Sequence, residues 1–123
     1  MEFFQRIPAN ALKNNKLKKL LTLKNLPVLC ASISAVISEK GNEADIYCIW
    51  GAFNVQRDEI KHGVRFSLLN CPHALSWTIT FDKGNQNIII HCTIDKNEQE
   101  QDFIDSIDEF VADWSQGITE ALR

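Results

Sequence analysis

Apolar and polar side chains alternate through the middle of this chain, from Gly63 to Ile94 (GVRFSLLNCPHALSWTITFDKGNQNIIIHCTI). Successive side chains of a strand point to opposite faces, so this alternation indicates half-buried strands. Pro72 has no backbone N–H to donate to a neighbouring strand, so it interrupts the run. The glycine and asparagines of residues 82–87 (DKGNQN) favour a turn. These breaks leave three strands, at residues 64–69, 75–81 and 88–94. They predict an antiparallel meander with one face covered.

Two further strands are expected upstream, at residues 28–38 and 45–55, with a turn at 39–43. The second has apolar side chains on both faces, which is typical of a strand that is covered twice. Gly51 within it predicts a bulge or a close approach of another backbone. Residues 56–63 are polar and are expected to be a connection or a hairpin end.

The N-terminal segment predicts a basic helix over residues 9–24, with Leu17, Leu20 and Leu21 on one side and lysines elsewhere. Pro8 can open this helix at its first position, and Pro27 is expected to end it. Residues 1–8 are expected to be a short arm, and its apolar side chains have helical spacing.

The last segment predicts a long amphipathic helix over residues 98–122. Its apolar positions recur at steps of three and four: Phe103, Ile107, Phe110, Trp114 and Ile118. Asn97 with Glu100 three residues later is typical of a capping box. The fold prediction is one α+β domain, residues 1–123. A five-stranded antiparallel β-meander carries a basic N-terminal helix and an acidic C-terminal helix packed on the sheet.

Charge is distributed unevenly along the chain. Residues 1–26 carry +5 and residues 98–123 carry −7, within a net charge of −3. The two segments either neutralise each other in the fold or leave an acidic surface free. Nucleic-acid binding is disfavoured, because the basic residues cluster in one segment without interleaved aromatic side chains.

The four cysteines, at positions 30, 48, 71 and 92, form no Cys-x-x-Cys pair. Such thiols are typical of buried residues in a reducing compartment, which predicts a cytoplasmic protein. The apolar run 26–37 contains a proline and alternates like a strand, so it is not interpreted as a signal peptide. No apolar run reaches the length of a membrane span.

Two Cys/His groups are candidates for metal binding or thiol catalysis. Zinc binding by Cys71, His73, His91 and Cys92 is disfavoured, because adjacent strand residues point to opposite faces and the spacing matches no zinc motif. Cys71 with His73 is the best thiol–base pair, but no glycine-rich oxyanion element follows it. Nucleotide-binding and hydrolase motifs are absent. We therefore expect no catalytic residue, metal or cofactor, and favour a protein that is not an enzyme.

Two hypotheses of function remain, together with a possible homodimer that buries a strand edge. The first is a binding protein, of the kind represented by immunity proteins and chaperones, that holds a basic protein partner. Its contacts would be acidic residues of the last helix: Asp102, Asp105, Asp108, Glu109 and Asp113. The alternative is a small-ligand or enzymatic domain with a pocket between sheet and helix. That pocket would be lined by Trp50, Phe66, Trp77 and Phe110.

Overall fold

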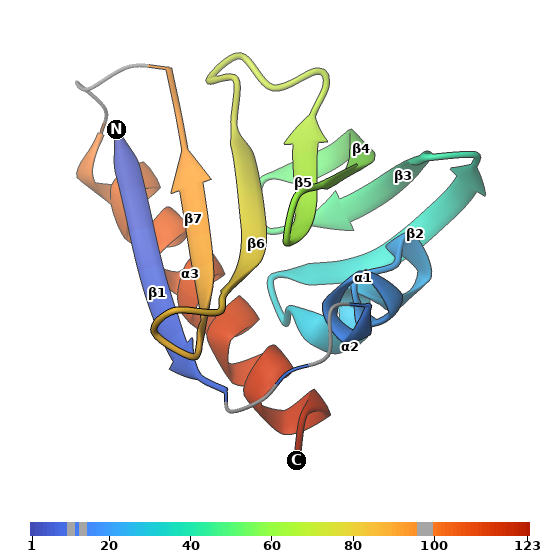
Figure 1. The fold of residues 1–123 in the computed structure, drawn as a ribbon. Helices are drawn as coiled ribbons and strands as arrows, with labels where there is room; N and C mark the ends of the chain where they lie inside the picture. The colour runs from blue at the N-terminus through green and yellow to red at the C-terminus, as the bar shows by residue number, and fades with distance from the viewer. Residues whose placement is uncertain (10–11, 13–14, 96–99) are drawn as a thin grey trace.

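The computed structural model describes residues 1–9, 12, 15–95 and 100–123. Within these residues one antiparallel sheet has seven strands in the order β1-β7-β6-β5-β4-β3-β2 (Figure 1). The expectation of a five-stranded meander was therefore wrong. From β2 to β7 each strand pairs with its neighbour in sequence, and β1 is added beside β7. The strands are β1 Glu2–Pro8, β2 Ile33–Lys40, β3 Glu43–Cys48, β4 Gly51–Ile60, β5 Gly63–Leu68, β6 Ser76–Asp82 and β7 Asn87–Thr93.

The helical elements lie on one side of this sheet. They are α1 Lys16–Leu20, a 3₁₀ turn Leu23–Asn25, α2 Leu26–Leu29 and the long α3 Gln101–Ala121. In Figure 1, α3 lies behind β1, β7 and β6, and α2 contacts its C-terminal half. None of the helices in the described part of the chain has the length and apolar character that a membrane crossing requires.

The predicted alternation of buried and outward-facing side chains is confirmed for the hairpin of β6 and β7. Trp77 pairs with Cys92 and Ile79 with Ile90, and all four side chains are buried. The alternate positions face outward and are half-buried. The period of two in the sequence therefore identifies the inner face of the sheet correctly.

The C-terminal helix is also confirmed, and its apolar side packs on the sheet. Its buried residues are Ile107, Phe110, Val111, Trp114 and Ile118. Burial of each large side chain contributes about 1.5–3 kcal/mol, so this face dominates the attachment of α3. The first two residues of the expected helix and Asn97 of the capping box lie outside the described residues.

The N-terminal arm forms a strand rather than a helical segment. Phe3 and Ile7 are buried, and they pair with Cys92 and Ile88 of β7. A spacing of four residues places two side chains on one face of a helix and also on one face of a strand. The exposed Gln5 between them removes the alternation that would have indicated a strand.

The expected basic helix is mostly replaced by shorter elements. Residues 10–11 and 13–14 of it lie outside the described residues, and α1 covers five residues. Pro27 does not end a helix, because it occupies the first turn of α2, where the missing N–H has no helical partner to lose. The strand expected from residue 28 therefore begins only at Ile33.

The strand expected at residues 45–55 is two strands joined by a tight turn at Ile49 and Trp50. Cys48 pairs with Gly51 across this turn, and Gly51 has a φ of +112°, a conformation that glycine adopts without a Cβ clash. The polar segment after it is not a connection, since β4 continues to Ile60. Arg57 in this segment donates from Nε to the Leu21 carbonyl at 2.6 Å, at the end of α1.

Candidate functional site

An apolar cavity of about 260 Å³ lies at the end of the sheet where α3 begins. Three parts of the chain form its wall: the β3–β4 hairpin, the loop from β5 to β6, and the first turn of α3. The lining residues are Trp50, Phe53, Leu68, Cys71, Pro72, His73, Leu75 and Phe103. The Cys71 thiol, the His73 imidazole and the Trp50 indole N–H supply the side-chain polar atoms of this wall.

Trp50 is held in the wall by α3. Its indole N–H donates to Oγ of Ser106 at 2.8 Å, and the Ser106 hydroxyl donates to the Phe103 carbonyl at 2.6 Å. The Trp50 ring also lies 4.9 Å from the Phe110 ring and 6.2 Å from the Phe103 ring, between centroids. The hairpin tip is therefore fixed to the helix through an aromatic side chain.

The loop from β5 to β6 places Cys71 and His73 in the same wall. The His73 ring lies 4.4 Å from the Phe103 ring, and the His73 carbonyl accepts from the Asp95 N–H at 3.0 Å. Ala74 has a φ of +49°, a left-handed conformation that costs an L-residue about 1–2 kcal/mol. Sparsely populated conformations of this kind cluster at ligand sites.

Cys71 and His73 both line the cavity, but no hydrogen bond joins them in the described part of the structure. Cys71 is half-buried, whereas the other three thiols are buried. Burial raises the pKa of Cys30 and of Cys92 to about 12. The four thiols therefore differ in accessibility, and Cys71 is the one that a reagent reaches from the cavity.

We expect iodoacetamide at about pH 8 to alkylate Cys71 in the folded protein and to leave Cys30 and Cys92 unmodified. The two buried thiols stay protonated at that pH because of their raised pKa. Peptide mass spectrometry locates the modified cysteines, and the same reaction in urea, where all four should react, is the control. Fast alkylation of Cys92 in the folded protein would contradict its place in the core.

The four aromatic residues expected to line a pocket are brought together, but only Trp50 faces this cavity. Phe66, Trp77 and Phe110 are at most 1% exposed and pack on each other, with ring centroids 5.3 Å apart for Phe66–Trp77 and 4.9 Å for Trp77–Phe110. Trp50 contacts this aromatic cluster through Phe110. The cavity lies to one side of them, at the helix N-terminus.

Four of the acidic residues proposed for partner binding, Asp102, Asp105, Asp108 and Glu109, are exposed on α3. Asp113 is half-buried and accepts a hydrogen bond from the Ser32 hydroxyl at 2.5 Å. The two ion pairs among the described residues join Arg57 to Glu59 and His91 to Glu2. Neither ion pair involves a carboxylate of α3. Binding of a basic protein partner to the acidic face of α3 stays a prediction.

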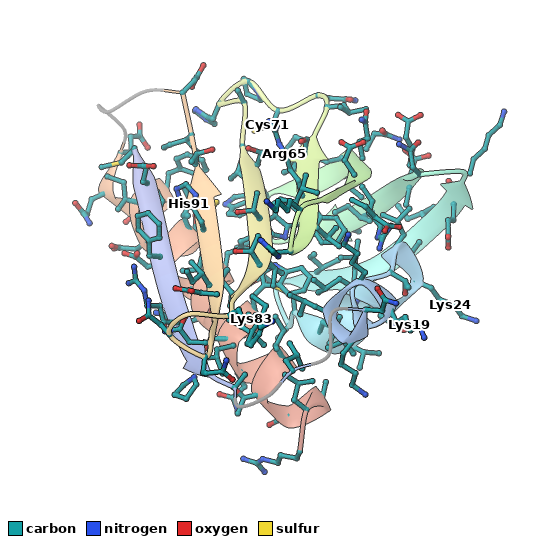
Figure 2. All side chains as sticks on the ribbon, viewed as in Figure 1. Lys19, Lys24, Arg65, Cys71, Lys83 and His91 are labelled. Carbon is teal, nitrogen blue, oxygen red and sulfur yellow. The ribbon has the colours of Figure 1, made fainter. Side chains whose placement is uncertain are left out.

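The Cys/His group considered for zinc is spread over the β5–β6 loop, which carries Cys71 and His73, and the two faces of β7. His91 stacks on Phe4, with ring centroids 4.3 Å apart, and Cys92 is buried in the core. Figure 2 shows His91 on β7 and Cys71 on the β5–β6 loop. Over the residues that the structure describes, no three His, Cys, Asp or Glu side chains come close enough to hold a metal ion.

Two solved structures share this fold. A Bacillus thuringiensis protein of uncharacterized function superposes with a TM-score of 0.66 at 13% identity, over 98% of this chain and 96% of that one. A START superfamily protein from Mycobacterium smegmatis superposes with a TM-score of 0.54 at 7% identity, over 98% of this chain and 93% of that one. No family model matches the sequence, and no curated protein matches it. Both likenesses concern the fold alone, which is an α+β fold with an antiparallel sheet and a C-terminal helix packed on it.

Proposed function

We propose that this protein binds a small, mainly apolar ligand in the cavity beside Trp50. The observation that carries the proposal is the cavity itself, which has aromatic walls and few polar groups. Ligand sites in proteins are usually concave and apolar, with a small number of polar groups that orient the ligand. Similarity of fold to a START superfamily protein favours a ligand-binding protein over the protein-binding alternative.

The lining favours a flat ring over a long chain. Trp50, Phe53 and Phe103 offer aromatic faces or edges, and His73 adds an imidazole tilted by 33° against Phe103. Aromatic pairs prefer offset or edge-to-face contacts, which such walls can provide. The volume of about 260 Å³ is just below the usual range for ligand pockets, so the ligand is small.

The affinity expected for a simple aromatic probe is modest. Removal of about 200 Å² of apolar surface from water contributes about 5 kcal/mol at ~25 cal/mol per Å². That free energy corresponds to a Kd of about 0.2 mM if the costs of association are small. The natural ligand would gain more through the Cys71 thiol and the His73 imidazole.

The test is a titration of the full chain with 2-naphthol, followed by ¹⁵N–¹H NMR. We expect shifts at the amides of Trp50, His73 and Phe103, and saturation at submillimolar to millimolar probe. Cys71→Phe places a ring in the cavity and should weaken binding at least tenfold. Leu69→Phe is the matched control, because Leu69 belongs to the same loop, is 49% exposed and does not line the cavity.

Equal binding by the Cys71→Phe and Leu69→Phe proteins would show that the cavity is not the site. Absence of any shift in the unmodified protein would reject the aromatic ligand class. Shifts confined to the exposed face of α3 would favour the acidic surface instead.

A further inference from the structure

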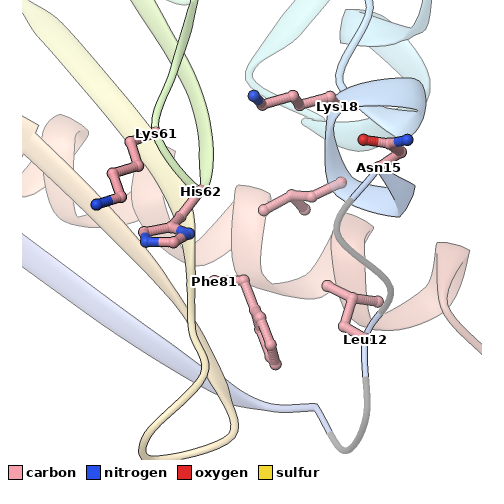
Figure 3. Close-up of a pocket in the computed structure, with 7 residues that line it drawn as sticks. Leu12, Asn15, Lys18, Lys61, His62 and Phe81 are labelled. Atoms are coloured by element: carbon pink, nitrogen blue, oxygen red, sulfur yellow. The ribbon is translucent and has the colours of Figure 1, made fainter.

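A second cavity, of about 230 Å³, lies at the opposite end of β5 and β6 (Figure 3). The β4–β5 turn and the end of β6 form one side of it. The other side comes from α1 together with Leu12 and Asn15. This cavity differs from the one beside Trp50 because its two halves have different chemistry.

One half of the second cavity carries side chains that donate hydrogen bonds. They are Asn15, Lys18, Lys61 and His62, and the described residues that line the cavity include no carboxylate. None of these four side chains has a hydrogen bond or ion pair within the described residues. Figure 3 shows His62 and Lys61 on the strand side and Lys18 and Asn15 on the helix side. Two lysine charges are thus left without a counter-ion.

The other half is apolar and consists of Leu12, Leu17 and Phe81. Leu17 is 2% exposed and belongs to the core, and the partly buried Leu12 and Phe81 pack against the core. A free inorganic anion would leave this wall without a contact. An ion with a hydrocarbon body would fill both halves.

The backbone of the β4–β5 turn supports a role for His62. Its φ is +71°, in a two-residue turn where glycine or asparagine is the favoured residue. The Phe81 N–H donates to the His62 carbonyl at 2.9 Å and holds the turn against β6. In Figure 3 the His62 ring lies above Phe81 at the cavity. A strained residue that presents a polar ring to a cavity is typical of a binding site.

We propose that this second cavity binds a small organic carboxylate. The carboxylate lies among Lys18, Lys61 and His62, and its hydrocarbon part lies against Leu17 and Phe81. A carboxylate is favoured over a phosphate ester because the described lining of the cavity includes no arginine, the side chain that matches phosphate with two parallel hydrogen bonds. This site is separate from the proposed function, which uses the other end of the sheet.

The probe is hexanoate, compared with hexanol and with inorganic phosphate, each titrated into the full chain and followed by ¹⁵N–¹H NMR. We expect hexanoate to shift the amides of Lys61, His62 and Phe81 and to bind at least tenfold more tightly than either comparison. Hexanol retains the hydrocarbon without the charge, and phosphate retains the charge without the hydrocarbon.

Lys18→Gln/Lys61→Gln should lose at least tenfold in hexanoate affinity. Lys83→Gln is the matched control, because Lys83 is an exposed lysine on the β6–β7 turn and does not line this cavity. His62→Asn keeps a residue that tolerates the left-handed backbone and should weaken hexanoate binding without unfolding. The 2-naphthol titration of each variant reports separately on the cavity beside Trp50.

Equal binding of hexanol, or undiminished hexanoate binding by the double variant, would overturn the proposal. Phosphate binding as tight as that of hexanoate would show that the site takes inorganic anions or headgroups rather than carboxylates, and would overturn it as well.

Discussion

Replacing Gly117 with alanine is expected to lower the free energy of unfolding by about 2 kcal/mol. Gly117 lies in α3, where the helix meets α2, and a Cβ there would overlap the carbonyl group of Leu29. The obstacle is backbone rather than the end of a flexible side chain, so the two helices must move apart. Overpacking of this kind costs about 1–3 kcal/mol or more. It outweighs the roughly 1 kcal/mol that alanine gains over glycine inside a helix.

Urea denaturation followed by circular dichroism measures this loss. Gly84→Ala is the control, because the nearest atom to its added Cβ is a side-chain oxygen of Asp82 at 3.4 Å and its φ is not positive. We expect the control to remain within about 0.5 kcal/mol of the original protein. A Gly117→Ala protein more stable than the original would mean that α2 and α3 do not approach closely at this point.

Replacing Trp114 with alanine is expected to cost about 4 kcal/mol of unfolding free energy. Trp114 is fully buried on α3, and its ring centroid lies 5.9 Å from that of Phe66 and 6.1 Å from that of Trp77. Removal of the indole leaves a void between helix and sheet that the surrounding strands cannot close. Urea denaturation by circular dichroism again gives the measurement.

Trp114→Phe provides the graded comparison. The Trp114 Nε1 has no hydrogen-bond acceptor among the described residues. Phenylalanine therefore removes an unpaired buried N–H together with part of the ring. The stability gained by losing the unpaired N–H offsets part of the stability lost with the smaller ring. We expect a loss of less than half of that caused by alanine. Equal losses for the two variants would show that the indole N–H has a partner, such as an internal water.

The inner face of the sheet could be predicted because its signal is local. Trp77, Ile79 and Cys92 alternate with polar residues, and strict alternation has no helical interpretation. The first strand could not be predicted in this way. The four-residue spacing of Phe3 and Ile7 fits both the helical period and the strand period. The pairing of Phe3 with Cys92 joins residues that are far apart in the sequence. A single sequence carries little information about such a distant pairing.

The hairpin tip at Ile49 and Trp50 was missed for a different reason. Tight turns usually contain polar residues or glycine, whereas this turn places tryptophan at its second position. Trp50 is stable there because α3 covers it and Ser106 accepts its N–H. In the sequence, only Gly51 indicates that a turn lies at this point. Tertiary contact with α3 therefore decides the local structure at this point.

The candidate site was predicted in part. Trp50, Cys71 and His73 were each identified from sequence, but for separate reasons, and the fold brings them into one cavity. Phe53 and Phe103 complete its wall. The sequence pattern identifies them only as apolar positions of a strand and a helix. Their role depends on where the hairpin tip meets the start of α3, which a periodicity does not specify.

The pairing of β1 with β7 has a consequence for how the chain folds as it is made. A ribosome releases β1 before its partner strand, which emerges some eighty residues later. Until then the nascent protein holds Phe3 and Ile7 without their strand partner. Closure of a contact so distant in sequence is slow compared with the hairpins of the meander. A fusion attached ahead of β1 would thus act on the final step of sheet assembly, and it would lower folding yield before it changed equilibrium stability.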